Sequence, residues 1–182
     1  SVGLPSEDID KFADTAAAAR WIIDNYAIDT GRLYWAGQSA GSMAIWQILS
    51  RYPEIGTGFL ASNGGISPQY DYSAEGLTQE TIDATWDVLK VFAQNHIGLY
   101  IQFGEHDGST NYHAAKYFYD VVSDYYRAEG LSEREIDRLV KFRVTPSEAY
   151  TVASGLTDHN VVRLMNWYPY NIIDMMDTVL AW

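Results

Sequence analysis

The apolar residues of the chain follow helical and strand-like periods in turn. From Ser6 to Tyr26 they recur three or four positions apart, which predicts an amphipathic helix. Short, mostly apolar runs of strand length follow at 32–36, 58–62 and 97–103. Helical spacing returns between and after them, at 43–52, 81–95 and 112–129. This alternation predicts parallel strands joined by crossover helices, which is an α/β fold with a mostly parallel sheet.

The last third of the chain gives weaker signals. Residues 127–146 carry many charges, and we expect a surface insertion there, with a short helix that starts at Ser132. A fourth strand is expected near residues 149–153, and a final helix over 160–182 that Pro169 interrupts. The length of 182 residues and the lack of any linker-like segment predict a single domain.

Composition narrows the range of partners. The 24 acidic and 12 basic residues give a net charge of −12, which disfavours nucleic acid and anionic membrane surfaces. No apolar stretch approaches the roughly 20 residues that a membrane-spanning helix needs. The chain has no cysteine, which excludes disulfides, thiol nucleophiles and cysteine-ligated metal sites.

The clearest chemical signal is the run Gly37-Gln38-Ser39-Ala40-Gly41, set where the 32–36 strand meets the next helix. A G-x-S-x-G run in that setting predicts a sharp elbow with the serine hydroxyl raised above the sheet edge as a nucleophile. The residues two positions before and after the serine must be small because larger side chains would collide across the turn, and Gly37 and Gly41 meet this requirement. The Ala40 N–H, in the first turn of the helix, is expected to stabilise a developing oxyanion. The alternative is a glycine-rich turn with an incidental serine.

A serine nucleophile needs a base and an orienting acid, which in this type of fold follow in the order Ser, Asp or Glu, His. Asp107, directly after the 97–103 strand, is the expected acid, with Glu105 as the alternative. His159, before the final helix, is the expected base because a loop there can reach back to Ser39. The other candidates for the base are His96, His106 and His113.

Metal and cofactor chemistry has little support in the sequence. His106, Asp107 and His113 are near one another in the chain, but their spacing matches no metal motif with a known mechanism. Neither glycine-rich nucleotide motif occurs. We therefore expect no metal and no cofactor.

Together these residues resemble the α/β-hydrolase superfamily. The run from Asp29 to Ser42 is similar to that of esterases related to polyhydroxybutyrate depolymerases and feruloyl esterases, and prolyl-oligopeptidase-like peptidases carry similar elbows. The resemblance spans nearly the whole chain and implies a three-layer sandwich with the triad Ser39, Asp107 and His159. It implies a serine hydrolase of carboxylic esters acting on a small-molecule or polymer-linked ester. A serine peptidase and a non-catalytic binding domain remain the alternatives.

One departure from the superfamily pattern concerns the start of the fold. Members have several strands before the elbow and an early loop that donates a second oxyanion-hole N–H, whereas 38 residues precede Ser39 here. We expect residues 1–182 to be the C-terminal catalytic portion of one domain. A separate N-terminal segment of the same protein is expected to complete the sheet, whose edge would otherwise be bare beside the elbow strand.

The segment 64–95 is expected to contribute to a cap near the active site. Within it, Tyr70, Tyr72 and Trp86 are candidates to line an acyl or aromatic pocket. The alternative is that these aromatic side chains only pack in the core.

Overall fold

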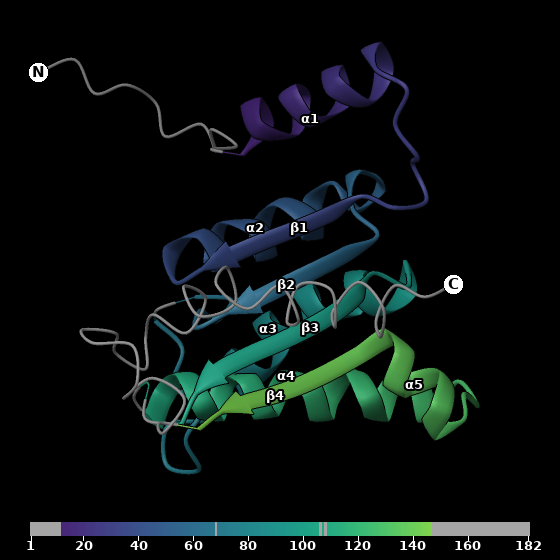
Figure 1. Cartoon of the computed structure of the whole chain (residues 1–182). Helices are drawn as coiled ribbons and strands as arrows, with labels where there is room; N and C mark the ends of the chain where they lie inside the picture. Colours follow the sequence, from purple (N-terminus) through teal and green to yellow (C-terminus); the bar gives the residue numbers. More distant parts are fainter. Residues whose placement is uncertain (1–11, 68, 106, 108, 147–182) are drawn as a thin grey trace, which may run out of the picture.

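The computed structural model describes residues 12–67, 69–105, 107 and 109–146, and its centre is a parallel sheet (Figure 1). Within these residues, four strands lie side by side in the order in which they occur in the chain. They are β1 (Tyr34–Gln38), β2 (Gly58–Ser62), β3 (Gly98–Gly104) and β4 (Val140–Thr145). The register sets Ala36 beside Leu60, and Leu60 beside Tyr100. The predicted α/β fold with a parallel sheet is confirmed.

Helices precede and connect the strands, and the first helix after each of β1, β2 and β3 covers one face of the sheet (Figure 1). They are α1 (Ala13–Asn25), α2 (Ala40–Arg51), the 3-10 turn η1 (Pro53–Ile55), α3 (Gln79–Gln94), α4 (Ser109–Ala128) and α5 (Glu133–Leu139). Helices α2, α3 and α4 pack against the same sheet face, while α1 contacts α2 and η1. Within the described residues, no helix combines the length and the apolar character needed to cross a membrane.

The core lies between the sheet and helices α2 to α4. Trp46 of α2 is fully buried and meets Phe59 of β2 and Phe118 of α4 edge to face, with ring centroids 5.0 and 5.4 Å apart. Alternate residues of β3 complete this layer, because successive side chains of a strand point to opposite faces. They are Leu99, Ile101 and Phe103. Burial of these large apolar side chains fixes the sheet against the helices that carry the candidate site.

The surface insertion predicted at residues 127–146 is wrong. Helix α5 occupies part of that range, and β4 then pairs in parallel with β3 from Leu99 beside Val140 to Gly104 beside Thr145. The strand was missed because Lys141 and Arg143 alternate with its apolar residues, whereas a parallel strand that is buried on both faces forms a continuous apolar run. The short helix expected from Ser132 is confirmed by α5, which Ser132 caps. The strand expected at 149–153 and the helix expected at 160–182 lie outside the described residues.

At the opposite side of the sheet, β1 is the outermost of the described strands, since its pairing partner among them is β2. Ala36, in the middle of β1, is exposed. Apolar side chains on α1 and the segment after it are exposed as well, with Trp21 at 57% and Tyr26 at 60%. The side of the molecule next to β1 therefore presents apolar surface in the described part of the chain.

Candidate active site

Ser39 lies between the last residue of β1 and the first residue of α2. Its backbone has φ 53° and ψ −123°, a conformation that residues other than glycine rarely adopt. Two hydrogen bonds hold it there: the Ser39 N–H donates to the Ser62 carbonyl at 2.9 Å, and the Met43 N–H donates to the Ser39 carbonyl at 3.1 Å. The strained elbow predicted from the sequence is present at this residue.

Glycines allow the chain to close around the elbow. A β-carbon on Gly37 would lie 2.7 Å from the Ser42 nitrogen and 2.8 Å from the Gly41 carbonyl carbon, so the close approach predicted at Gly37 is confirmed. The collision predicted at Gly41 is not observed: apart from its chain neighbours and the backbone of α2 itself, a β-carbon there would meet no described heavy atom within 4 Å. A tighter contact occurs at Gly64, after β2, where a β-carbon would lie 2.4 Å from the Ser39 carbonyl oxygen. Gly64 is thus a part of the elbow that no local sequence motif predicted.

Ala40 is placed to act on an oxyanion. It is the first residue of α2, and the N–H groups in the first turn of a helix have no partner within the helix. The Ala40 N–H makes no hydrogen bond to any described residue. The Ser39 side chain does not cap α2 either. This helix N-terminus, with its partial positive charge, can therefore stabilise negative charge that develops next to Ser39.

Asp107 lies on the loop after β3, and its N–H donates to the Gly104 carbonyl at 3.2 Å. Its carboxylate accepts a short hydrogen bond at Oδ2 from the side-chain amide of Asn63, the residue after β2. The neighbouring Ser62 carbonyl accepts the hydrogen bond from the Ser39 N–H. The structure thus brings the candidate acid and the candidate nucleophile to the same edge of the sheet, joined through the end of β2.

The structure describes three of the other acid and base candidates, Glu105, His96 and His113. Glu105 is exposed on the loop that carries Asp107. His96 precedes β3 and so lies at the end of the parallel sheet away from Ser39, and His113 is exposed on α4. Within the described residues, no three histidine, aspartate or glutamate side chains gather as a metal site. Outside the described residues lie His106 and His159.

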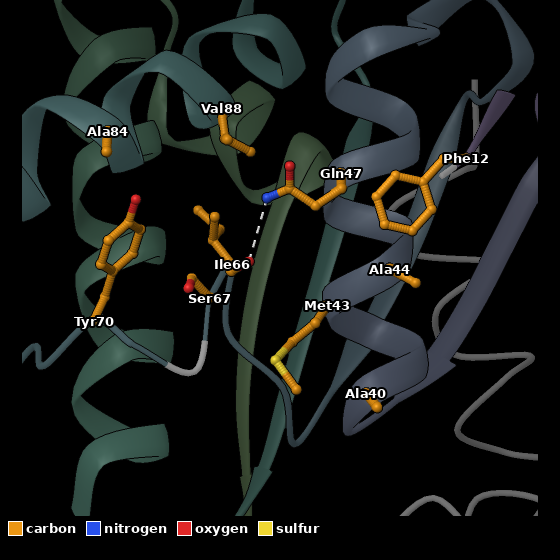
Figure 2. A pocket seen from close by; sticks show the side chains of 10 residues that line it. All are labelled: Phe12, Ala40, Met43, Ala44, Gln47, Ile66, Ser67, Tyr70, Ala84 and Val88. Carbon is orange, nitrogen blue, oxygen red and sulfur yellow. Dashed lines mark hydrogen bonds between the residues drawn. The ribbon is translucent and has the colours of Figure 1, made fainter. Parts of the chain in front are cut away.

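An open groove of about 630 Å³ begins beside the elbow (Figure 2). One side is a face of α2 that starts at Ala40 and includes Met43 and Gln47. The facing side consists of the segment after β2 and one face of α3. These residues are Ile66, Ser67, Tyr70, Ala84 and Val88. The Gln47 amide donates to the Ile66 carbonyl at 3.3 Å, which joins α2 to the facing segment across the groove (Figure 2).

Of the three aromatic residues proposed to line a substrate pocket, Tyr70 lies at this groove (Figure 2). Tyr72 is 5% exposed, and its hydroxyl lies 2.8 Å from Thr85 Oγ1 inside the core. Burial raises the pKa of Tyr72 well above that of a free phenol. Trp86 packs beside Tyr125 of α4, with ring centroids 5.6 Å apart. The structure therefore places Tyr72 and Trp86 in packing positions, which was the alternative interpretation.

The segment expected as a cap divides into two parts. Residues 79–94 form α3, the crossover helix between β2 and β3, and its Leu89 and Phe92 are fully buried in the core. The preceding segment borders the groove through Ile66, Ser67 and Tyr70. The helical part is thus integral to the domain.

Comparison with known proteins supports this reading of the fold. Residues 8–95 match the prolyl oligopeptidase family. The crystal structure of a thermostable esterase is similar, with a TM-score of 0.61 at 15% sequence identity. The similarity covers 91% of this chain and 36% of the esterase chain, so this chain spans about a third of the esterase's length. No curated protein sequence matches significantly. The chain has the α/β-hydrolase fold; the finer resemblance to polyhydroxybutyrate depolymerases and feruloyl esterases stays a prediction.

Proposed function

We propose that this chain is the catalytic portion of a serine hydrolase that cleaves carboxylic esters through an acyl-enzyme. The observation that carries the proposal is the backbone of Ser39, with φ 53° and ψ −123° between a parallel strand and a helix N-terminus. Strained residues of this kind persist where the surrounding structure enforces them, and they concentrate at functional sites. The match of residues 8–95 to a hydrolase family and the esterase-like fold support the same function.

In the proposed reaction, Ser39 Oγ attacks the ester carbonyl carbon while His159 accepts the hydroxyl proton. The Ala40 N–H stabilises the negative oxygen of the tetrahedral intermediate. The protonated His159 then gives its proton to the departing alcohol, and Asp107 orients the imidazole throughout. Water then attacks the carbonyl carbon of the acyl-enzyme while His159 accepts a proton from it. The bond to Ser39 Oγ breaks, His159 returns the proton to this oxygen, and the carboxylic acid is released. The mechanism uses no metal and no cofactor.

The groove is the proposed binding site for the acyl part of a small-molecule or polymer-linked ester. It begins at Ala40, next to the position of the reacting carbonyl, and none of the described residues that line it is charged. Its apolar lining and the Tyr70 ring favour an uncharged aliphatic or aromatic group.

A separate N-terminal segment of the same protein is the proposed partner of β1. Helix α1 lies on the side of the sheet that α2 covers, and it leads directly into β1. Crossovers between parallel strands are almost always right-handed, so a strand before α1 would lie against the outer edge of β1. The exposed apolar side chains near that edge, including Trp21 and Tyr26, fit burial by such a segment.

The proposed activity is tested with a fluorophosphonate and an aryl ester. The reagent should label Ser39 covalently in the full chain, and peptide mapping should find the adduct on the peptide that contains it. Ser39→Ala should lower kcat by about 10⁴-fold or more, because members of a triad act as a unit. Ser50→Ala is a matched control, since the Ser50 hydroxyl donates to the Gln47 carbonyl within α2 and lies outside the elbow. An active preparation that is labelled elsewhere would contradict the assignment.

A serine peptidase is the second candidate, because the matched family is that of prolyl oligopeptidase. Comparison of an aryl ester with a peptide amide of the same acyl group separates the two activities. Peptide hydrolysis at a kcat/KM similar to or above that of the ester would favour the peptidase. A chain that binds ligands in the groove but hydrolyses neither substrate would favour the third alternative, a binding domain.

A further inference from the structure

Asn63 lies between the candidate acid and the strand end that holds the candidate nucleophile. Its Nδ2 donates to Asp107 Oδ2, and its Oδ1 accepts a hydrogen bond from Ser62 Oγ at 3.0 Å. Its backbone N–H donates to the Gln102 carbonyl of β3 at 3.0 Å. Asn63 itself is 1% exposed and its bond to Ser62 is buried, while its bond to Asp107 is partly buried. Hydrogen bonds are stronger, and their loss more costly, where water is largely excluded.

The position makes three demands that together select asparagine. The backbone is left-handed, with φ 51°, which glycine, asparagine and aspartate tolerate best. A donor must face the Asp107 carboxylate, and an acceptor must face the Ser62 hydroxyl. Glycine satisfies the backbone but has no amide, while aspartate would set an acceptor against a carboxylate. Only the asparagine side chain meets all three demands.

We propose that Asn63 is a positioning residue of the active site, an inference that rests on the proposed hydrolase function. Its amide holds Asp107 Oδ2 and so fixes the orientation of the carboxylate that is proposed to orient the base. The same strand end holds the Ser39 N–H through the Ser62 carbonyl. The dipeptide Ser62-Asn63 therefore sets the acid and the nucleophile in one rigid frame, which the reaction needs because small displacements of catalytic groups are costly.

Two substitutions in the full chain distinguish the role of the Asn63 side chain from that of its backbone conformation. Asn63→Gly keeps the left-handed backbone and removes the amide; we expect kcat for an aryl ester to fall about ten- to a hundredfold with little change in KM. Asn63→Asp keeps the shape and adds a negative charge near the base. The charge favours the protonated imidazole, so the acidic limb of the pH–rate profile should move up by about one unit.

His96→Gly is the matched control, because His96 has the same φ of 51° but is exposed and lies away from Ser39. It should leave kcat and the pH profile unchanged. Wild-type kcat in Asn63→Gly, or an unmoved acidic limb in a folded Asn63→Asp, would overturn the positioning role. Thermal unfolding of each variant shows whether it is folded, and Asn63→Gly provides the test if Asn63→Asp is not.

An NMR measurement distinguishes failure of this inference from failure of the proposed function. The side-chain amide signals of Asn63 should shift and lose protection from exchange in Asp107→Ala. If the wild type is an active esterase and the Asn63 amide signals in Asp107→Ala match those of the wild type, the inference alone would be overturned. A chain that has the amide link but neither hydrolyses esters nor reacts with fluorophosphonate would overturn the proposed function and, with it, the catalytic role of Asn63.

Discussion

A β-carbon on Gly64 would lie 2.4 Å from the carbonyl oxygen of Ser39, closer than unbonded atoms can approach. The same segment is bonded to α2, because the Gly64 carbonyl accepts hydrogen bonds from Ser42 Oγ at 3.2 Å and Trp46 Nε1 at 3.3 Å. The segment after β2 is thus pressed against the elbow, and it helps to hold Ser39 in its strained conformation.

Gly64→Ala should therefore disturb the elbow. We expect a loss of about 1 to 3 kcal/mol in the free energy of unfolding, the usual cost of overpacking, and much slower labelling of Ser39 by fluorophosphonate. Denaturant unfolding and labelling kinetics measure the two effects. Gly65→Ala is the control, since a β-carbon there would make ordinary contacts at 3.8 and 3.9 Å. Equal behaviour of the two variants would refute the role of Gly64.

Esterase activity should fall as the pH drops through the pKa of the base. A neutral imidazole accepts the Ser39 proton and a protonated one does not, so activity is lost on the acid side of about pH 6.5 for an unperturbed histidine. The measurement is kcat/KM for an aryl ester from pH 5 to 8. His159→Gln should remove the activity, whereas His113→Gln, on an exposed part of α4, should leave the profile as it is. A flat profile would count against a histidine base.

The groove should discriminate between acyl groups. Val88 lines its far side on α3, and Val88→Asp would place a charge where an apolar acyl chain is expected to bind. We expect kcat/KM for an octanoyl ester to fall by roughly ten- to a hundredfold relative to the wild type, with the acetyl ester nearly unchanged. Gln94→Asp, at the exposed end of the same helix, adds the same charge away from the groove. A parallel loss for both esters in Val88→Asp would contradict the assignment.

The chain of residues 1–182 by itself should be poorly soluble or self-associated, because the β1 edge and the apolar side chains of α1 would be exposed to water. Addition of the proposed N-terminal segment should yield a soluble complex with reduced acrylamide quenching of Trp21. Size-exclusion chromatography and intact-mass analysis test this expectation. A soluble, active monomer of 20.5 kDa would show that the edge needs no partner.

The local pattern of the sequence was enough to find most elements. Strand 58–62 was predicted with the observed bounds, and the predicted 97–103 strand is displaced from β3 by one position at each end. Fully buried strands are continuous apolar runs, so they stand out without knowledge of their neighbours. The elbow was equally local, because Gly37 approaches Gly41 and Ser42, which are only four and five positions further along the chain. Strand β4 escaped because half of its residues are polar, and only its pairing with β3 makes it part of the sheet.

The sequence by itself determined the alternation of strands and helices and the position of Ser39 at a strand–helix junction, since both depend on residues a few positions apart. Tertiary structure decided which side chains meet across the sheet. It set Gly64 against the Ser39 carbonyl and Asn63 against Asp107, 44 positions further along the chain. It also placed Tyr70 at the groove and Tyr72 in the core, although they lie two residues apart. Contacts of this kind depend on how parallel strands bring distant loops to one edge, and no local spacing encodes them.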